Sequence, residues 1–555
     1  MNGRRSFLHG AAAIGLLSGC RRSAPTVPPR SGPATVVVRG GSIRTGVAAE
    51  QVEALAIRDG VVMAVGSQAD AAAWIGRDTT VVDLAGGSAC PGLCDAHAHL
   101  VGLGRSLAVV DLRDARSHDE VVARLREHAP ASGWIVGRGW DQNLWPGGAM
   151  PDHRPLTAAF PDRPVWLRRV DGHAGWGNLA LLREAGITRA SSSPAGGEIL
   201  RDGAGEPTGV LVDAAMALVA VPAPAAATRR TQLLAAQQHA LQRGLTGVHE
   251  MGIDEADDAL YRTLADEGLL ALRVHAYASE AWLTGSLAQR RPDAVTPSTR
   301  YALRGVKLYA DGALGSRGAA LLADYDDRAG HRGLMQHTPA ELEALVARAT
   351  EGGWQPATHA IGDAANRAVL DAYERVMTAA QRRALRPRIE HCQVLAPGDV
   401  PRFAALGVIA SMQPTHATSD MAWVPDRIGA RSQGAYVWRS LLLQGASVCL
   451  GSDFPVERVE PTLGLYAAIT RQDLQGNPPQ GWMPEQRLSL DEAVFGFTQG
   501  AAFAAGREGH LGTLAPGMRA DVTCFAAPLD EAHPHTIAAL PVLATIVDGT
   551  VAWRA

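Results

Sequence analysis

The stretch "ACPGLCDAHAHL" (residues 89–100) places two histidines, His97 and His99, at the polar end of a largely apolar run. An H-x-H triplet alone is weak support for a metal site, because the chain has 18 histidines and a second triplet, "HPH", at residues 533–535. Residues two apart in a strand point to the same side, so the first triplet predicts a metal site at a strand end. No apolar run precedes the second triplet, and its proline could not donate in a central strand, which predicts a surface loop.

The centre of the chain alternates strand-like runs with helical patterns. With residues 89–100 it offers eight strand candidates, the other seven being residues 244–251, 271–279, 305–313, 354–362, 386–394, 407–414 and 447–456. Between them lie helix signals, such as Thr338, which can cap a first turn that has Glu341 three residues on. Alternation of this length predicts an α/β fold with a parallel sheet, and eight units predict a (β/α)8 TIM-like barrel over residues 91–507.

Two further parts are expected around this barrel. Residues 105–230 are too long a connection for one helix and hold their own strand-like pieces, which predicts a subdomain inserted after the first barrel strand. Inserts there fall on the face that carries barrel active sites, so we expect a lid. Both chain ends, residues 34–90 and 508–555, are rich in short strands and are predicted to pair into one small composite β-sandwich domain.

The first 33 residues predict export. Residues 1–20 combine paired arginines, a short apolar run and "LSGC", which resembles a twin-arginine signal with a bacterial lipobox. Residues 21–33 form a Pro/Ser/Arg linker. We therefore expect a protein of the bacterial periplasm or cell envelope, anchored to the membrane only through a lipid on Cys20. Cleavage to a soluble periplasmic form, or a plain basic and apolar tail, are the alternatives.

Composition limits the partners. Of 555 residues, 46% are hydrophobic and 19% charged, so the chain can bury a large core. A net charge of −4 and a pI near 6.5 give no electrostatic case for nucleic acid, and we expect a small-molecule substrate. The oligomeric state is left open, a homo-oligomer included.

Six residues share one position, the polar end of an apolar strand candidate. They are His97, His99, Lys307, His359, His391 and Asp453. Neutral imidazole and carboxylate are ligands suited to zinc and similar divalent metals. Singly, a strand-end histidine is more often a core residue, Asp453 could cap a turn, and Lys307 could form an ion pair. The agreement of all six at barrel strand ends predicts a metal site.

This pattern resembles the amidohydrolase superfamily, with H-x-H on strand one, lysine on strand four, histidines on strands five and six and aspartate on strand eight. Longer strings are similar to its amidohydrolase family 3 branch, among them "GWIVGRGWDQNLWP", "KLYADGALGSRGAAL", "THAIGDAANRAVLDAYE", "IEHCQ" and "GSDFPVERVEPTLGLYAAITRQ". The similarity runs from about residue 34 to the chain end. It is specific for the family and not for a substrate.

The resemblance implies a ligand set. His97 and His99 would bind a first metal with Asp453 nearby, and His359 and His391 would bind a second. One or two divalent ions are expected, with zinc as the expected metal.

Lys307 cannot ligate as an ammonium, which has no lone pair. In binuclear relatives this lysine is carbamylated by CO2 and the carbamate bridges both metals, so the resemblance implies N6-carboxylated Lys307 if the centre is binuclear. The competing interpretation is one metal with Lys307 unmodified.

The chemistry that the resemblance implies is hydrolysis by metal-bound hydroxide. Asp453 would be the catalytic residue, taking the proton from the nucleophile and delivering it to a departing nitrogen. We expect an amidohydrolase acting on a C–N bond of an amide, formamide or related acyl-nitrogen compound. The same centre could instead hydrolyse an ester, lactone or phosphoester, and a non-catalytic surface lipoprotein is the remote alternative.

Three other residues are predicted substrate contacts. His173 lies in the insert, where a structural role is an equal alternative, while Asp311 and Arg317 follow the lysine strand and could orient a carbonyl or carboxylate. A helix cap and an ion pair are their alternatives. Three tryptophans of the insert are expected to pack its core rather than line a pocket: Trp140, Trp145 and Trp176.

Overall fold

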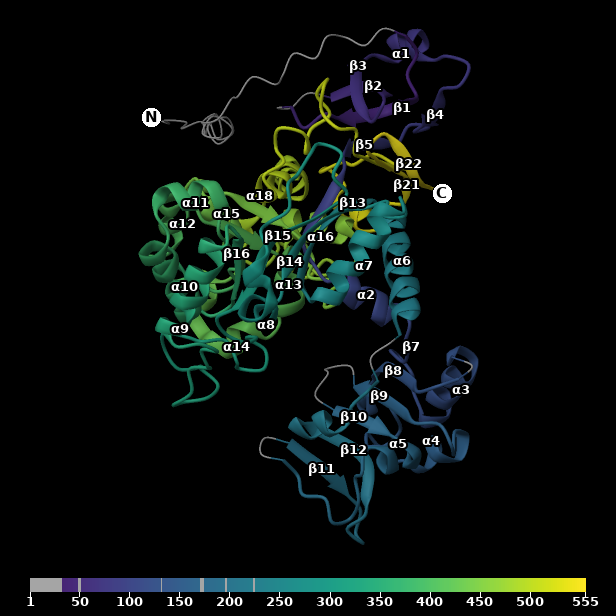
Figure 1. Ribbon diagram of the computed structural model, residues 1–555, viewed down its shortest axis with the longest axis vertical. Coiled ribbons are helices and arrows are strands. Elements are labelled where there is room, and N and C mark those ends of the chain that lie inside the picture. Colours follow the sequence, from purple (N-terminus) through teal and green to yellow (C-terminus); the bar gives the residue numbers. More distant parts are fainter. Residues whose placement is uncertain (1–31, 48–50, 131, 170–173, 195–196, 223–224) are drawn as a thin grey trace, which may run out of the picture. The chain divides into compact units, whose positions relative to one another are not determined.

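The computed structural model describes residues 32–47, 51–130, 132–169, 174–194, 197–222 and 225–555 (Figure 1). The chain divides into two compact units, of which one is Leu103–Ala235 and the other holds the remaining residues. The predicted export signal with Cys20 and most of the predicted linker lie outside the described residues. Among the described helices, none has the length and apolar character that crossing a membrane requires.

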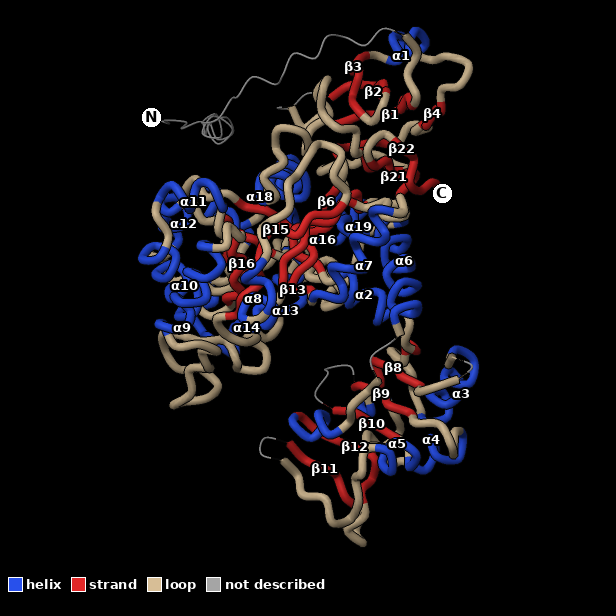
Figure 2. Tube along the Cα trace, in the orientation of Figure 1, coloured by secondary structure: helices blue, strands red, loops and turns tan. Residues whose placement is uncertain are grey.

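The larger unit contains eight parallel strands in a nearly closed barrel (Figure 2). They pair in chain order: β6 (Leu93–Ala98), β13 (Leu245–Ile253), β14 (Arg273–Ala278), β15 (Tyr301–Tyr309), β16 (Gln355–Ala360), β17 (Arg388–His391), β18 (Ile409–Met412) and β19 (Val448–Leu450). Each of the eight predicted strand stretches overlaps one of these strands. The predicted α/β barrel is confirmed.

Helices follow the barrel strands along the chain. They are α7 (Glu255–Asp266), α8 (Glu280–Thr284), α9 (Pro339–Glu351), α10 (Asp363–Val376), α12 (Val400–Leu406), α13 (Pro414–Asp420), α15 (Trp438–Leu443), α16 (Pro461–Thr470) and α17 (Leu490–Phe495). The expected cap of α9 is present, since the Thr338 side chain accepts from the Glu341 N–H while the Glu341 carboxylate accepts from the Thr338 N–H. Local capping therefore starts this helix where the sequence predicts.

The first predicted run divides between two sheets. Strand β5 (Ser88–Pro91) pairs antiparallel with β20 (Val522–Phe525), and the barrel strand β6 begins only at Leu93. Between them the Gly92 N–H donates to the Asp521 carbonyl, and a Cβ at Gly92 would lie 2.4 Å from the Thr246 hydroxyl oxygen. The chain can pass from one sheet to the other here because residue 92 has no side chain.

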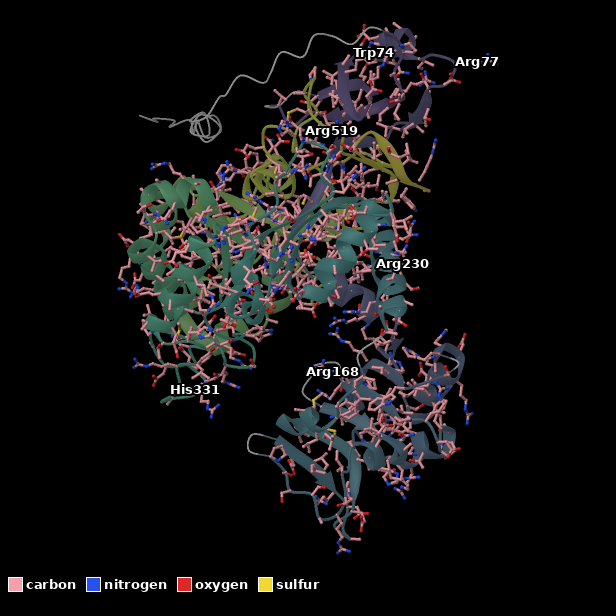
Figure 3. All side chains as sticks on the ribbon, in the orientation of Figure 1. Trp74, Arg77, Arg168, Arg230, His331 and Arg519 are labelled. Atoms are coloured by element: carbon pink, nitrogen blue, oxygen red, sulfur yellow. The ribbon has the colours of Figure 1, made fainter. Side chains whose placement is uncertain are left out.

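Strands from both chain ends join one eight-stranded sheet in the order β22-β21-β20-β5-β1-β2-β3, with β4 paired to β1. The remaining bounds are β1 (Val36–Arg44), β2 (Gln51–Arg58), β3 (Val61–Gly66), β4 (Thr80–Asp83), β21 (Val542–Val547) and β22 (Thr550–Arg554). A buried ionic cluster ties this sheet to the barrel. Arg273, at the start of β14, binds the Asp521 carboxylate at 2.6 and 3.0 Å and Asp548 at 2.6 Å, and Arg519 (Figure 3) also pairs with Asp548.

The smaller unit has a sheet of its own, in the order β11-β12-β10-β9-β8-β7. Its strands are β7 (Val110–Asp111), β8 (Ile135–Trp140), β9 (Val165–Arg169), β10 (Ala174–Gly177), β11 (Gly197–Arg201) and β12 (Pro207–Asp213), and its helices include α3 (His118–His128), α4 (Arg154–Ala159) and α5 (Leu179–Glu184). Trp140, Trp145 and Trp176 are buried with ring centroids 5.8–6.0 Å apart, and each indole N–H donates to a backbone carbonyl. These tryptophans pack the core of the unit, as expected. Its role as a lid stays a prediction.

Candidate metal centre

The six selected residues all lie at the carboxyl end of the barrel strands. Strands β6, β15 and β16 contain His97, Lys307 and His359, strand β17 ends at His391, and His99 and Asp453 follow β6 and β19. The carboxyl ends of parallel strands meet on one face of a barrel, so five segments distant in the chain contribute to one place.

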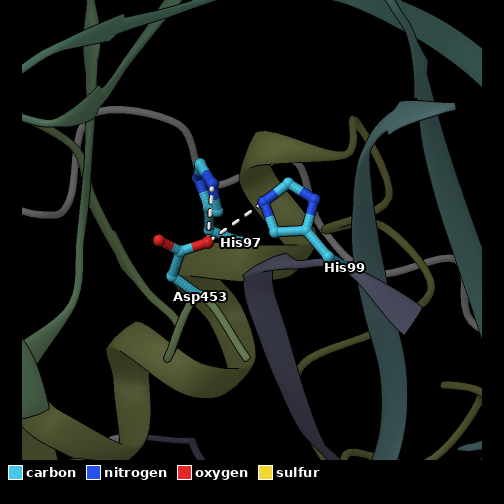
Figure 4. A group of neighbouring side chains, drawn as sticks. All are labelled: His97, His99 and Asp453. Atoms are coloured by element: carbon cyan, nitrogen blue, oxygen red, sulfur yellow. Dashed lines mark ion pairs between the residues drawn. The ribbon is translucent and has the colours of Figure 1, made fainter. Parts of the chain in front are cut away.

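His97, His99 and Asp453 form a compact group (Figure 4). The Asp453 Oδ1 atom lies 3.5 Å from His97 Nε2 and 3.1 Å from His99 Nε2. Burial by itself would lower the pKa of His99, but the Asp453 carboxylate outweighs this effect and raises that pKa. Burial by itself would raise the pKa of Asp453, but the two imidazoles hold that pKa below its usual range. The group therefore favours positive charge between its members, which a proton or a metal cation can supply.

The ring orientations suit metal binding. His99 Nδ1 lies 3.0 Å from the Met251 carbonyl oxygen, which can only accept, so Nδ1 carries the proton and Nε2 is left with a lone pair. His97 Nδ1 lies 2.6 Å from a carboxylate oxygen of Glu390, and His391 Nδ1 lies 2.8 Å from Gln413 Oε1. Metal-ligating histidines have this pattern, in which one ring nitrogen is held by an acceptor and the other faces the ion.

A second compact group consists of His391, His416 and Asp453. The Nε2 atom of His416 is buried without a hydrogen-bond partner among the described residues and lies 3.9 Å from Asp453 Oδ2. The rings of His391 and His416 stack at a centroid distance of 5.9 Å. Buried ring nitrogens are rarely left without a partner, so this atom is a candidate contact for a metal ion or a substrate.

His359 is brought beside His391, with ring centroids 4.6 Å apart, but it does not belong to either compact group among the described residues. Its Nε2 atom is buried, lacks a hydrogen-bond partner in the described chain and lies 3.6 Å from Asp311 Oδ1. Lys307 Nζ is buried 3.2 Å from His97 Nε2. Burial lowers the pKa of Lys307 to about 8, so part of this amine is neutral and nucleophilic near neutral pH.

Comparison with known proteins identifies the family. Residues 80–552 match the sequence profile of the amidohydrolase family. The chain belongs to the amidohydrolase family. Over 543 aligned residues it is 35% identical to the protein LONG AFTER FAR-RED 3 of Arabidopsis thaliana. The alignment covers 94% of this chain and 92% of that protein. It is 27% identical over 520 residues to the N-substituted formamide deformylase of Arthrobacter pascens, covering 90% and 95%.

A solved structure agrees with this assignment. The crystal structure of an uncharacterized metal-dependent hydrolase from Pyrococcus horikoshii matches this amidohydrolase with a TM-score of 0.74 and 28% identity, covering 87% of this chain and 96% of that one. Family and structure together support hydrolase activity that depends on a divalent metal. The residues present fit such an ion. The imidazole nitrogens around Asp453 and the neutral form of the Lys307 amine offer lone pairs, and Asp453 offers a carboxylate.

The predicted substrate contacts of the amidohydrolase have different surroundings. Asp311 is fully buried, and its carboxylate accepts from the backbone N–H groups of Ala320, Ile361 and Gly362 at 2.8–2.9 Å. Asp311 thereby ties the segment after β15, the strand that contains Lys307, to the end of β16. Arg317 is half-buried and binds the Asp327 carboxylate at 2.8 and 3.0 Å, while His173 lies outside the described residues. Substrate contact by these residues stays a prediction.

Two residues near the candidate centre, His416 and Glu390, do not follow from the strand-end pattern. His416 stands two residues after Pro414, in the first turn of α13, and extending the search from strand ends into the next helix turn would have found it. Glu390 directly precedes His391 in β17, where it looks like an ordinary strand residue. No local signal shows that its carboxylate reaches His97, because that contact joins residues 293 positions apart.

The two H-x-H triplets provide a matched test of metal binding. The amidohydrolase is expected to hold about one to two equivalents of a zinc-like metal, and His97→Asn/His99→Asn is expected to lose at least one of them because two imidazole ligands are removed. Metal analysis measures this, and chelator should lower Tm of the wild type and of the control more than that of His97→Asn/His99→Asn, since a bound metal stabilises the folded state. His533→Asn/His535→Asn is the control. Full metal content in His97→Asn/His99→Asn would contradict the assignment.

Proposed function

We propose that this amidohydrolase hydrolyses the C–N bond of a small amide, formamide or related acyl-nitrogen compound. The observation that carries the proposal is the buried carboxylate of Asp453, with one oxygen toward His97 and His99 and the other toward His416. The similarity to a formamide deformylase over 90% of the chain supports an acyl-nitrogen substrate. Water would add to the acyl carbon, the C–N bond would break, and a carboxylate and an amine would leave.

His97, His99 and Asp453 would hold a first divalent ion, with zinc as the proposed metal, and His359 and His391 would hold a second. When bound, such an ion polarises the substrate carbonyl and lowers the pKa of a coordinated water. The protein's own contribution is to fix the ligand positions. Asp453 follows the short strand β19, and its backbone N–H donates to the His97 carbonyl at 2.7 Å, so the aspartate and the first histidine are held together.

Asp453 would move the proton. Since neighbouring imidazoles keep its pKa below the usual range, the carboxylate is ionised at neutral pH and can accept a proton from water at Oδ2. The same oxygen can then deliver the proton to the departing nitrogen. His416, 3.9 Å from Oδ2, would donate a hydrogen bond from Nε2 to the substrate.

A carboxylate between imidazoles would also support hydrolysis of an ester, lactone or phosphoester, because those reactions need the same water-derived nucleophile. This is the alternative within the same centre, and an inert surface lipoprotein is the remote one. The intact set of metal-binding side chains favours an enzyme.

A panel of N-substituted formamides, other N-acyl compounds and esters tests the reaction. Asp453→Asn is expected to lose about 100-fold to 10000-fold in kcat because the general base is gone, while it keeps much of the bound metal. His416→Asn should lower turnover and leave the metal content unchanged. Initial rates and metal analysis on the same preparations measure both.

Asp258→Asn is the control, because Asp258 is a buried aspartate of α7 that pairs with Arg262 of the same helix and with Arg290. Its rates should match those of the wild type. Turnover by metal-free wild type would rule out the proposed reaction, and hydrolysis of esters but not of acyl-nitrogen compounds would favour the alternative.

We also propose that the neutral amine of Lys307 adds CO2 and releases a proton, and that the resulting carbamate would help to hold two ions; the burial and lowered pKa of Lys307 support this. Lys307→Arg cannot form a carbamate and is expected to lose one metal equivalent. Lys307→Glu supplies a carboxylate at the same place and should retain part of it. Metal stoichiometry in bicarbonate buffer measures the difference, and equal stoichiometry in wild type and Lys307→Arg would favour a single ion beside an unmodified lysine.

We propose export to the periplasm or cell envelope with a lipid anchor on Cys20, on the strength of residues 1–20. Expressed in a bacterium that has the twin-arginine route, the protein should fractionate with membranes and carry an acylated N-terminal cysteine, detected by mass spectrometry. Cys20→Ala should abolish the acylation. A mature N-terminus without acyl groups, or an uncleaved tail in the cytoplasm, would contradict this.

A further inference from the structure

An ion pair lies inside the barrel directly beneath the candidate metal centre. Arg388 and Glu390 stand two residues apart on β17, so their side chains share the face that points into the barrel. Both are fully buried. The guanidinium binds the carboxylate in a bidentate manner, with Nε at 2.6 Å from Oε1 and Nη2 at 2.9 Å from Oε2.

The carboxylate of this pair also holds a candidate ligand. Glu390 Oε2 lies 2.6 Å from His97 Nδ1, and because a carboxylate accepts, the proton resides on Nδ1. The other nitrogen, Nε2, then presents its lone pair toward the Asp453 carboxylate. A dashed line joins the two groups in Figure 4. Glu390 thus selects the one tautomer of His97 that can bind a metal.

The arginine fixes the carboxylate in turn. It donates from Nη2 to the Ala96 carbonyl at 2.6 Å and to Ser411 Oγ at 2.7 Å, and from Nη1 to His249 Nδ1 at 2.7 Å and the Tyr277 hydroxyl at 3.0 Å. These partners belong to strands β6, β18, β13 and β14. Four other strands therefore hold Arg388, and Arg388 in turn fixes the position of the Glu390 carboxylate.

His97 differs from His99 and His391 in the charge of the group that holds its Nδ1 atom. His99 is held by the backbone carbonyl of Met251 and His391 by the side-chain amide of Gln413, both neutral acceptors. A carboxylate partner raises the basicity of an imidazole and so strengthens it as a ligand.

We propose that Arg388 and Glu390 are a positioning pair that fixes the tautomer of His97 and sets the affinity of the metal bound there. The proposal rests on the metal centre proposed above. The competing interpretation is an ion pair that serves the barrel core alone, in which case its loss would change stability and leave metal affinity unmoved in any folded variant.

Metal affinity of the apo protein, measured by competition with a chromogenic zinc chelator, tests the pair without a substrate. Glu390→Gln keeps an acceptor oxygen and removes the charge, and it is expected to weaken one zinc equivalent about 10-fold. Arg388→Met/Glu390→Leu removes both charges and the acceptor, and the loss should approach about 100-fold, the range typical of partners that hold a ligand. Asp258→Asn, which weakens the pairing of a buried aspartate with two partly exposed arginines, should bind zinc like the wild type.

The double variant guards against misfolding, because a buried ion pair replaced by apolar side chains of similar volume often leaves stability unchanged. Circular dichroism and Tm identify the folded variants. Wild-type zinc affinity in folded Arg388→Met/Glu390→Leu would overturn the proposal. It would also be overturned if neither variant of the pair gave soluble protein while Asp258→Asn did, because the pair would then serve folding. Absence of zinc binding in the wild type would instead overturn the proposed metal centre.

Discussion

The candidate centre depends on closure of the barrel between its first and last strands. The Asp453 N–H donates to the His97 carbonyl, and the Asp95 carboxylate on β6 accepts from the N–H and hydroxyl of Ser452. These bonds join residues that are about 357 positions apart in the chain. Without this closure the H-x-H pair and the aspartate would belong to separate edges of an open sheet.

Closure also places several ionisable groups in a space that excludes water. Burial lowers the pKa of His97 well below its usual range and that of His359 to about 3, so these rings are neutral and available as ligands. The backbone contributes as well, because His391 and Asp453 adopt left-handed conformations with φ of 74° and 61°. For residues other than glycine this costs on the order of 1–3 kcal/mol each, and such strain gathers at functional sites, where the surrounding structure maintains it.

The sequence was informative where the structure is local or repeats regularly. Alternating strands and helices predicted the barrel, and strand ends predicted a ligand set, because parallel strands present their carboxyl ends on one face. It failed at contacts between distant strands. The link from Glu390 to His97 crosses the barrel, and His416 reaches the centre from a helix turn, so neither position follows from the period of its own segment.

By itself the sequence determined the elements of this protein: the eight strands, the cap of α9 and the residues at the strand ends, since capping and apolar periodicity act over a few residues. Only the tertiary structure decided which of these residues meet. It divided the first run at Gly92 between two sheets, brought His416 to 3.9 Å from Asp453, and oriented His97 through Glu390. The physical reason is that ligand orientation depends on hydrogen bonds made across the closed barrel, and no segment contains both partners of such a bond.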